Sequence, residues 1–119
     1  MGYDGYIEVY PKQDDNPDYV LQDHPEFMRL PAPFESVDFY HTDYSDFLHD
    51  PIVDYYRSRH PELQDKHLSC CYFKITPAIC ILLEQACGNS DHPNANFIRD
   101  ELITRVADDS PYEFYYRFD

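Results

Sequence analysis

The sequence predicts an α+β fold: a small, mostly antiparallel sheet of three or four strands with two or three helices packed on one face. Segments with strand alternation begin and end the chain, and a strong helix pattern lies between them. Strands and helices do not alternate regularly, as they would in a doubly wound parallel sheet. The chain has 119 residues, 43% of them hydrophobic, so we expect a single domain, residues 1–119.

The first half of the chain predicts strands separated by a long loop. In residues 5–12, Ile7 and Val9 alternate with polar residues and tyrosines, which indicates a strand. Residues 13–33 carry four prolines and several acids, so we expect an ordered loop that apolar side chains tie to the body. A second, irregular strand is predicted around residues 36–41.

The second half begins with a helix, preceded by a predicted turn over residues 45–49. Asp50 and Pro51 suit the N-cap and the first position of a helix that ends before Pro61. Residues 69–74 then predict a strand.

The clearest helix follows, with Thr76 as its N-cap, Pro77 at its first position and Gly88 as its terminator. Four residues at i, i+3, i+4 and i+7 predict the side that faces the core: Ile79, Leu82, Leu83 and Ala86.

A further helix and a last strand complete the prediction. Residues 96–107 place three apolar residues on one helical stripe: Ile98, Leu102 and Val106. Residues 110–119 alternate strictly, and one side of the predicted strand carries Tyr112, Phe114, Tyr116 and Phe118.

The charge of the chain is strongly negative and unevenly distributed. It has 23 acids against 9 Lys and Arg, a formal net charge of -14. Residues 1–54 carry a net charge of -11, residues 55–90 carry +1 and residues 91–119 carry -4. This excludes a basic surface for nucleic acid or for an anionic membrane. The N-terminus lacks the basic and apolar regions of a signal peptide, and no apolar run is long enough to span a membrane, so we expect a cytoplasmic protein.

Metal and cofactor sites find little support in the sequence. Asp14, Asn16 and Asp18 have the spacing of calcium ligands, but Tyr19 stands where an EF-hand needs Gly, and Pro25 where it needs Glu. With only three glycines, the chain has no phosphate-binding glycine loop. We expect neither metal nor cofactor.

The four cysteines do not predict a zinc site. Cys80 and Cys87 are seven residues apart on one helix, or about 10.5 Å along its axis, too far to share one ion. Cys70 and Cys71 would point to opposite faces of a strand. We expect reduced cysteines that pack as small apolar residues.

Catalysis also lacks a motif. There is no nucleophile elbow, and with six His among 23 acids some His must lie near a carboxylate by chance. An enzyme that uses His41, His49 and His60 with neighbouring carboxylates stays as an alternative, which requires these three histidines to converge.

The acidic first half favours a binding surface for a cationic partner. Asp46, Asp50 and Asp54 are four residues apart, so on one helix they would share a face and repel one another. A basic partner relieves such repulsion, and tyrosines among the acids supply contact area for its arginines. The candidate partner-binding residues are Asp14, Asp15, Asp18, Asp23, Asp38, Tyr40, Asp43, Tyr44, Asp46, Asp50 and Asp54.

In size, acidity and lack of a catalytic motif, the chain resembles small phage-encoded anti-defence proteins, which include anti-CRISPR proteins and DNA-mimic inhibitors of restriction enzymes. The resemblance covers the whole chain loosely and carries over no functional residue. It implies a non-enzymatic inhibitor in a bacterial host cell that blocks the nucleic-acid-binding groove of a CRISPR effector complex, as a monomer or homodimer, with no direct contact to nucleic acid or membrane.

Other interpretations of the charge remain open at this point. An immunity protein or antitoxin would neutralise a basic nuclease by the same physics. A halophilic surface explains the excess of Asp but not its concentration in residues 1–54. An ordinary small acidic domain, whose charge only keeps it soluble, explains the total but not its placement.

Overall fold

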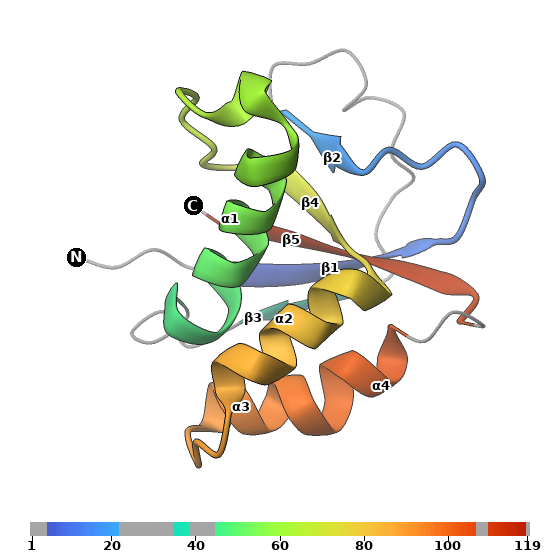
Figure 1. The fold of residues 1–119 in the computed structure, drawn as a ribbon. Coiled ribbons are helices and arrows are strands. Elements are labelled where there is room, and N and C mark those ends of the chain that lie inside the picture. The colour runs from blue at the N-terminus through green and yellow to red at the C-terminus, as the bar shows by residue number, and fades with distance from the viewer. Residues whose placement is uncertain (1–4, 22–34, 39–44, 107–109, 119) are drawn as a thin grey trace.

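The computed structural model describes residues 5–21, 35–38, 45–106 and 110–118 and confirms the predicted α+β fold. The helices lie together on one side of an antiparallel sheet with the order β2-β4-β5-β1-β3 (Figure 1). The strands are β1 (Gly5–Pro11), β2 (Tyr19–Val20), β3 (Glu35–Asp38), β4 (Tyr72–Ile75) and β5 (Tyr112–Phe118). The helical segments are η2 (Ser45–His49), α1 (Asp50–Arg59), η3 (Pro61–Leu63), α2 (Pro77–Cys87), α3 (Pro93–Phe97), η4 (Ile98–Leu102) and α4 (Ile103–Arg105).

The sheet is built around β5, the last described strand. Seven residues of β5 pair with β1, from Gly5 opposite Phe118 to Pro11 opposite Tyr112, and four pair with β4 on its other side. The sheet contains one more strand than the upper bound of our prediction, because two residues of the predicted loop 13–33 form β2 beside β4. Burial of Val20, which is 1% exposed, holds β2 against the body.

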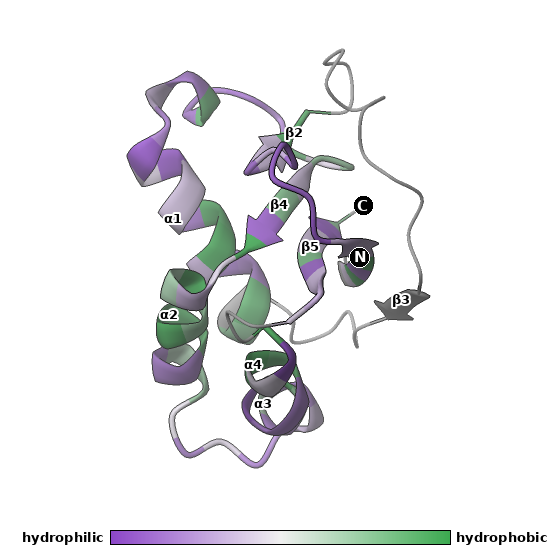
Figure 2. Ribbon diagram, turned by 90° about the vertical axis from the view of Figure 1, so that its right-hand side faces the viewer, coloured by the Kyte–Doolittle hydropathy of each residue, from purple (hydrophilic) through white to green (hydrophobic). Residues whose placement is uncertain are grey.

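The core lies between the sheet and the helices. Alternation works as predicted: Ile7 and Val9 of β1, like Phe114, Tyr116 and Phe118 of β5, face the helices and are buried. Figure 2 shows the helical layer beside the sheet, with α2 apolar along much of its length. Burial of this apolar area is the main term that stabilises the fold.

The helix over Pro77–Cys87 is confirmed, but the predicted core side is wrong in part. The buried residues of α2 are Ile79, Cys80, Leu83 and Cys87. Leu82 is half-buried and Ala86 is exposed. Relative to the prediction, the helix is rotated about its axis so that Cys80 and Cys87 face the core in place of Leu82 and Ala86. Burial raises the pKa of the Cys80 thiol to about 11. At its end, Gly88 has φ +52°, which favours glycine.

The segment before α2 differs from the predicted strand 69–74. The strand starts only at Tyr72, and Cys70 and Cys71 lie in the turn that precedes it. Cys70 has φ +66°, and its N–H donates to the carbonyl of Phe118 over 2.6 Å. The argument that the two thiols point to opposite faces of a strand therefore does not apply.

Two helix starts also differ from the prediction. Asp50 does not cap α1, because the helical backbone continues into it from η2 through His49, without a side-chain cap. The predicted helix 96–107 starts earlier, at Pro93, where His92 accepts a hydrogen bond from Asn94 N–H. Its middle, η4, is a π-helix. Ile98, Leu102 and Val106 nevertheless form the predicted buried stripe.

Candidate interaction surface

The first group of predicted partner-binding residues lies on the loop between β1 and β2. Asp14, Asp15 and Asp18, here termed the loop acids, are exposed. Asp18 is 69% exposed, but its carboxylate lies 3.6 Å from the ammonium of Lys74. Asp14 and Asp15 form no ion pair with any base that the structure describes.

The second group lies on α1. Asp50 and Asp54, here termed the helix acids, are exposed one helical turn apart, about 6 Å along the axis. Neither forms an ion pair within the described part of the chain. Asp46 lies in η2, and Asp38 lies in β3. Four predicted residues lie outside the described residues: Asp23, Tyr40, Asp43 and Tyr44.

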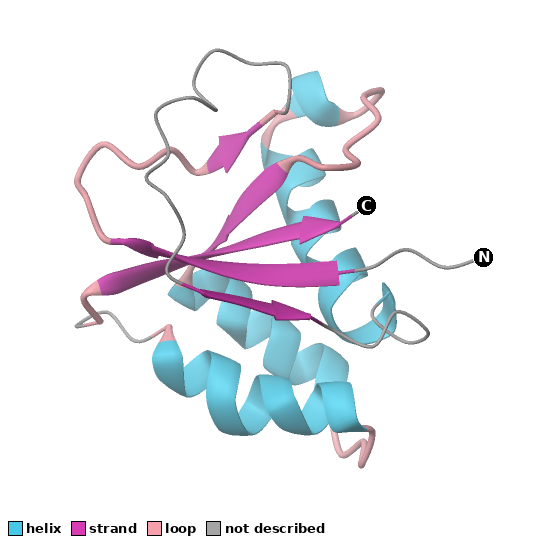
Figure 3. Cartoon of the chain, turned by 180° about the vertical axis from the view of Figure 1, so that it is seen from behind, coloured by secondary structure: helices cyan, strands magenta, loops and turns pink. Residues whose placement is uncertain are grey.

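The two groups do not form one face. In Figure 1 the β1–β2 loop is at the right edge of the molecule and α1 is at the left, and in Figure 3, seen from behind, the two are again at opposite sides. The described acids therefore offer two separate patches. A partner that contacts one patch along a flat surface would leave the other in solvent.

Many of the described bases are held by their own chain. Lys74 lies 3.0 Å from Glu113, Arg105 lies 3.5 Å from Glu101, and Arg117 lies 2.9 Å from Glu8. Other guanidinium groups donate to backbone carbonyls, as Arg99 does to Gly88 and Ser90, and as Arg57 does to Lys66. Of the acids in the two patches, Asp18 is compensated by Lys74, whereas Asp14, Asp15, Asp50 and Asp54 form no ion pair with a described base.

The face of the sheet opposite the helices holds a buried polar network that the sequence did not reveal. Glu8 is only 5% exposed. One of its oxygens accepts a hydrogen bond from the Tyr10 hydroxyl over 2.7 Å, and the other accepts from Arg117 Nε over 2.9 Å. The Arg117 guanidinium also lies 4.5 Å from the ring centroid of Tyr6 and 5.9 Å from that of Tyr72. Burial, followed by the Glu8 hydrogen bond, raises the pKa of Tyr10, so this phenol stays protonated.

Two of the three histidines that the enzyme alternative needs, His49 and His60, lie far apart. His49 precedes α1 and His60 follows it, so about 16 Å of helix separates them. His49 Nδ1 lies 2.8 Å from the Tyr116 hydroxyl, and His60 lies 3.7 Å from Glu62. His41 is outside the described residues. His49 and His60 therefore cannot act together in one cleft, as the enzyme alternative requires.

Glu62 belongs to a small exposed cluster at the end of α1. The Tyr19 hydroxyl donates to its carboxylate over 2.6 Å, and this bond is the main cause that lowers the pKa of Glu62. The Tyr19 ring also contacts His60 at 4.8 Å between centroids. The cluster connects β2 to η3, so these contacts give Tyr19 a structural role.

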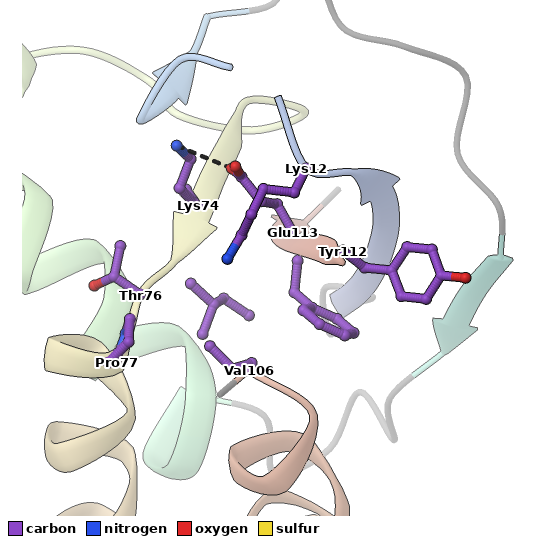
Figure 4. A pocket seen from close by; sticks show the side chains of 9 residues that line it. Lys12, Lys74, Thr76, Pro77, Val106, Tyr112 and Glu113 are labelled. Carbon is purple, nitrogen blue, oxygen red and sulfur yellow. Dashed lines mark ion pairs between the residues drawn. The ribbon is translucent and has the colours of Figure 1, made fainter. Parts of the chain in front are cut away.

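A cleft opens where β4 ends and α2 and β5 begin. It encloses about 150 Å³, and Lys12, Lys74 and Glu113 stand at its polar rim (Figure 4). No group of three or more His, Cys, Asp or Glu side chains suited to a metal ion occurs among the described residues. Within the same residues, no helix has the length and hydrophobicity to cross a membrane.

No protein-family model, curated protein or solved structure matches this chain.

Proposed function

We propose that the protein is a non-enzymatic inhibitor that binds the basic nucleic-acid-binding surface of another protein in the cytoplasm. The observation that carries this proposal is the exposure of Asp14, Asp15, Asp50 and Asp54 without an ion pair to a described base, while Lys74 and Arg117 are held by the protein's own carboxylates. Such a surface attracts a cationic partner over a distance of about one Debye length.

The helix acids are the primary contact in this proposal. Asp50 and Asp54 stand on a rigid helix whose inner side is buried through Ile52, Val53 and Tyr56. Their positions are therefore fixed before binding, which lowers the entropic cost of association. Tyr55 and Arg59 on the same helix contact each other, with the guanidinium carbon 4.3 Å from the ring centroid.

The partner class follows from the resemblance and the charge together. A CRISPR effector complex with a basic nucleic-acid groove is the partner that we propose first. A basic nuclease, neutralised by an immunity protein or antitoxin, presents the same chemistry, so both belong in one binding assay.

The test compares three variants, each of which removes two negative charges. Asp50→Asn with Asp54→Asn changes the helix acids, and Asp14→Asn with Asp15→Asn changes the loop acids. The matched control is the pair Glu84→Gln and Asp100→Asn, at exposed positions of α2 and η4 that form no ion pair with a described base.

We expect the helix-acid variant to bind a purified effector or nuclease about tenfold more weakly, a loss of about 1.4 kcal/mol. The control should change affinity less than threefold. Binding of the wild type should weaken steeply as salt rises, because screening shortens the reach of the carboxylates. Salt-independent binding, or an equal loss in all three variants, would show that the patches do not form the contact.

A further inference from the structure

The outer side of α2 is apolar, although the helix lies at the surface of a highly charged protein. Of its eleven residues only Glu84 carries a charge, whereas 27% of the whole chain is charged. The side opposite the buried one carries four residues at i, i+3, i+4 and i+7, here termed the outer row: Ala78, Ile81, Leu82 and Gln85. Ile81 is 61% exposed and Leu82 is half-buried. Helices that are apolar all round are normally covered on every side, so the outer row is suited to a covering that the chain does not supply.

The helix acids lie on the same side of the helical layer as the outer row. Since α1 buries Ile52, Val53 and Tyr56 against the body, Asp50 and Asp54 face away from the sheet. α2 packs against both α1 and η2, the segment that leads into α1. In Figure 2 the two long helices lie at the left edge of the molecule, with the strands to their right. An apolar row and two carboxylates therefore share one outer surface.

The charge beside the outer row is negative. Neither the helix acids nor Glu84 forms an ion pair with a base in the described part of the chain. The two arginines of α1 belong to its last turn and have other contacts there. Arg57 donates to the Lys66 carbonyl over 3.2 Å, and the Arg59 guanidinium carbon lies 4.3 Å from the ring centroid of Tyr55. A partner for this surface therefore has to supply both an apolar contact and positive charge.

A second copy of this chain does not have that chemistry. In a two-fold dimer through the outer row, the same surface of both copies would meet, and the helix acids of one copy would approach those of the other. Each copy has a net charge of -14, so this approach would bring like charges together at a cost in affinity. The charge of the surface thus favours a different, basic protein.

We propose that the outer row and the helix acids form one docking surface for a cationic amphipathic segment of another protein. Apolar side chains of that segment would pack on Ile81 and Leu82, and its lysines or arginines would lie against the helix acids. An apolar centre with charged groups at its edge is typical of protein interfaces. The inference rests on the proposed function for the class of partner, and adds to it an apolar contact that salt does not screen.

The test uses two synthetic peptides that carry a fluorescent label. The first has about 18 residues, or five helical turns, with leucines along one face and lysines on both flanks. The second has the same composition in scrambled order, so it keeps the charge but has no apolar face. Fluorescence anisotropy during titration with the full-length protein gives the dissociation constant of each peptide. The amphipathic peptide should bind about tenfold more tightly than the scrambled one.

Three variants separate the apolar contact from the charge. Ile81→Gln should weaken binding of the amphipathic peptide about tenfold both at about 0.1 M and at about 1 M salt. Asp50→Asn with Asp54→Asn should weaken it about tenfold at the lower salt concentration and hardly at the higher one, where the Debye length is only about 3 Å. Tyr112→Gln is the matched control for Ile81→Gln. It removes the other large apolar side chain that is exposed in the described chain, 44% exposed at the start of β5, and should change the affinity less than about threefold.

The possible failures can be told apart. Equal binding of the two peptides, or equal losses in Ile81→Gln and Tyr112→Gln, would overturn the docking surface, while binding of an effector or nuclease through the helix acids could still hold. Peptide binding as expected, without binding of either effector or nuclease, would instead contradict the proposed function and support the docking surface. A wild-type dimer that Ile81→Gln converts to a monomer in analytical ultracentrifugation would identify a second copy as the occupant and overturn the proposal.

Discussion

The two faces of the sheet are both shielded from solvent, but by opposite chemistry. On the helical face, apolar side chains such as Ile7 and Phe73 are at most 1% exposed. On the other face, the carboxylate of Glu8 and the ring of Tyr10 are almost as deeply buried, at 5% and 3%, with Arg117 beside them. The same strands, with the same alternation, thus build an apolar layer and a polar one.

The difference lies in what each face requires of its neighbours. The helical face gains stability from apolar area and packing, in which many contacts contribute a little each. The opposite face tolerates a buried charge only because both oxygens of Glu8 have donors, Tyr10 and Arg117. Removal of Arg117 alone should therefore lower the free energy of unfolding more than removal of both Arg117 and Glu8.

The largest effect is expected on the helical face. Phe73→Ala removes a fully buried ring from β4 and should lower the free energy of unfolding by about 3–5 kcal/mol. Ile81→Ala on α2 is the control, because Ile81 is 61% exposed and its truncation should cost less than about 0.5 kcal/mol. Urea denaturation followed by circular dichroism measures both. Similar losses in the two variants would mean that the core does not lie where the structure puts it.

The next effect belongs to the polar face. Arg117→Leu leaves one oxygen of the buried Glu8 without its donor and should cost about 2–3 kcal/mol, less than for a fully buried pair because Arg117 is 23% exposed. Adding Glu8→Leu should restore most of the lost stability. If the double variant were less stable than Arg117→Leu alone, the network would stabilise the fold by more than the pairing of Glu8 with its donors.

The smallest effect is a pH dependence of the stability that comes from His49, on the helical side of the sheet. Burial lowers the pKa of His49 below its ordinary value of about 6.5, and Arg57 acts in the same direction, while Asp50 and Asp54 oppose it. Below pH 6.5, His49 then binds more protons in the unfolded chain than in the folded chain. The free energy of unfolding that His49 contributes is therefore lost as the pH falls.

The variant His49→Gln should lower the stability at pH 7, because the contact with the Tyr116 hydroxyl is altered, and should flatten the decline between pH 7 and pH 5. Urea denaturation at several pH values measures this change. The control is His67→Gln at an exposed position. An unchanged decline in the His49→Gln variant would assign the acid sensitivity to other groups.

Much of the fold could be predicted because the signals are local. The alternation of β1 and β5, and the Thr76 cap and Gly88 terminator of α2, depend on neighbours in the sequence. The partners of Glu8 could not be predicted, because Arg117 is 109 positions away and meets it only through the register of β1 with β5. Alternation shows which side chains share a face but not whether solvent reaches that face.

The candidate surface was predictable to a similar degree. Exposure of Asp14, Asp15, Asp50 and Asp54 follows from their charge. Their division into two patches depends on how the β1–β2 loop and α1 are placed around the sheet, which spacing along the chain does not determine. The cleft beside α2 was missed for the same reason, since Lys12, Lys74 and Val106 come from three distant segments.

The central position of β5 has a consequence for the order of folding during synthesis. Without residues 112–118, β1 can pair only with β3, and β4 only with β2, so the described sheet falls into two separate pairs of strands. The sheet can therefore close only after β5 has left the ribosome and met β1, across the 100 residues that separate the two strands. Contacts of such sequence separation slow folding, and we expect the nascent chain to stay open until β5 joins the two pairs.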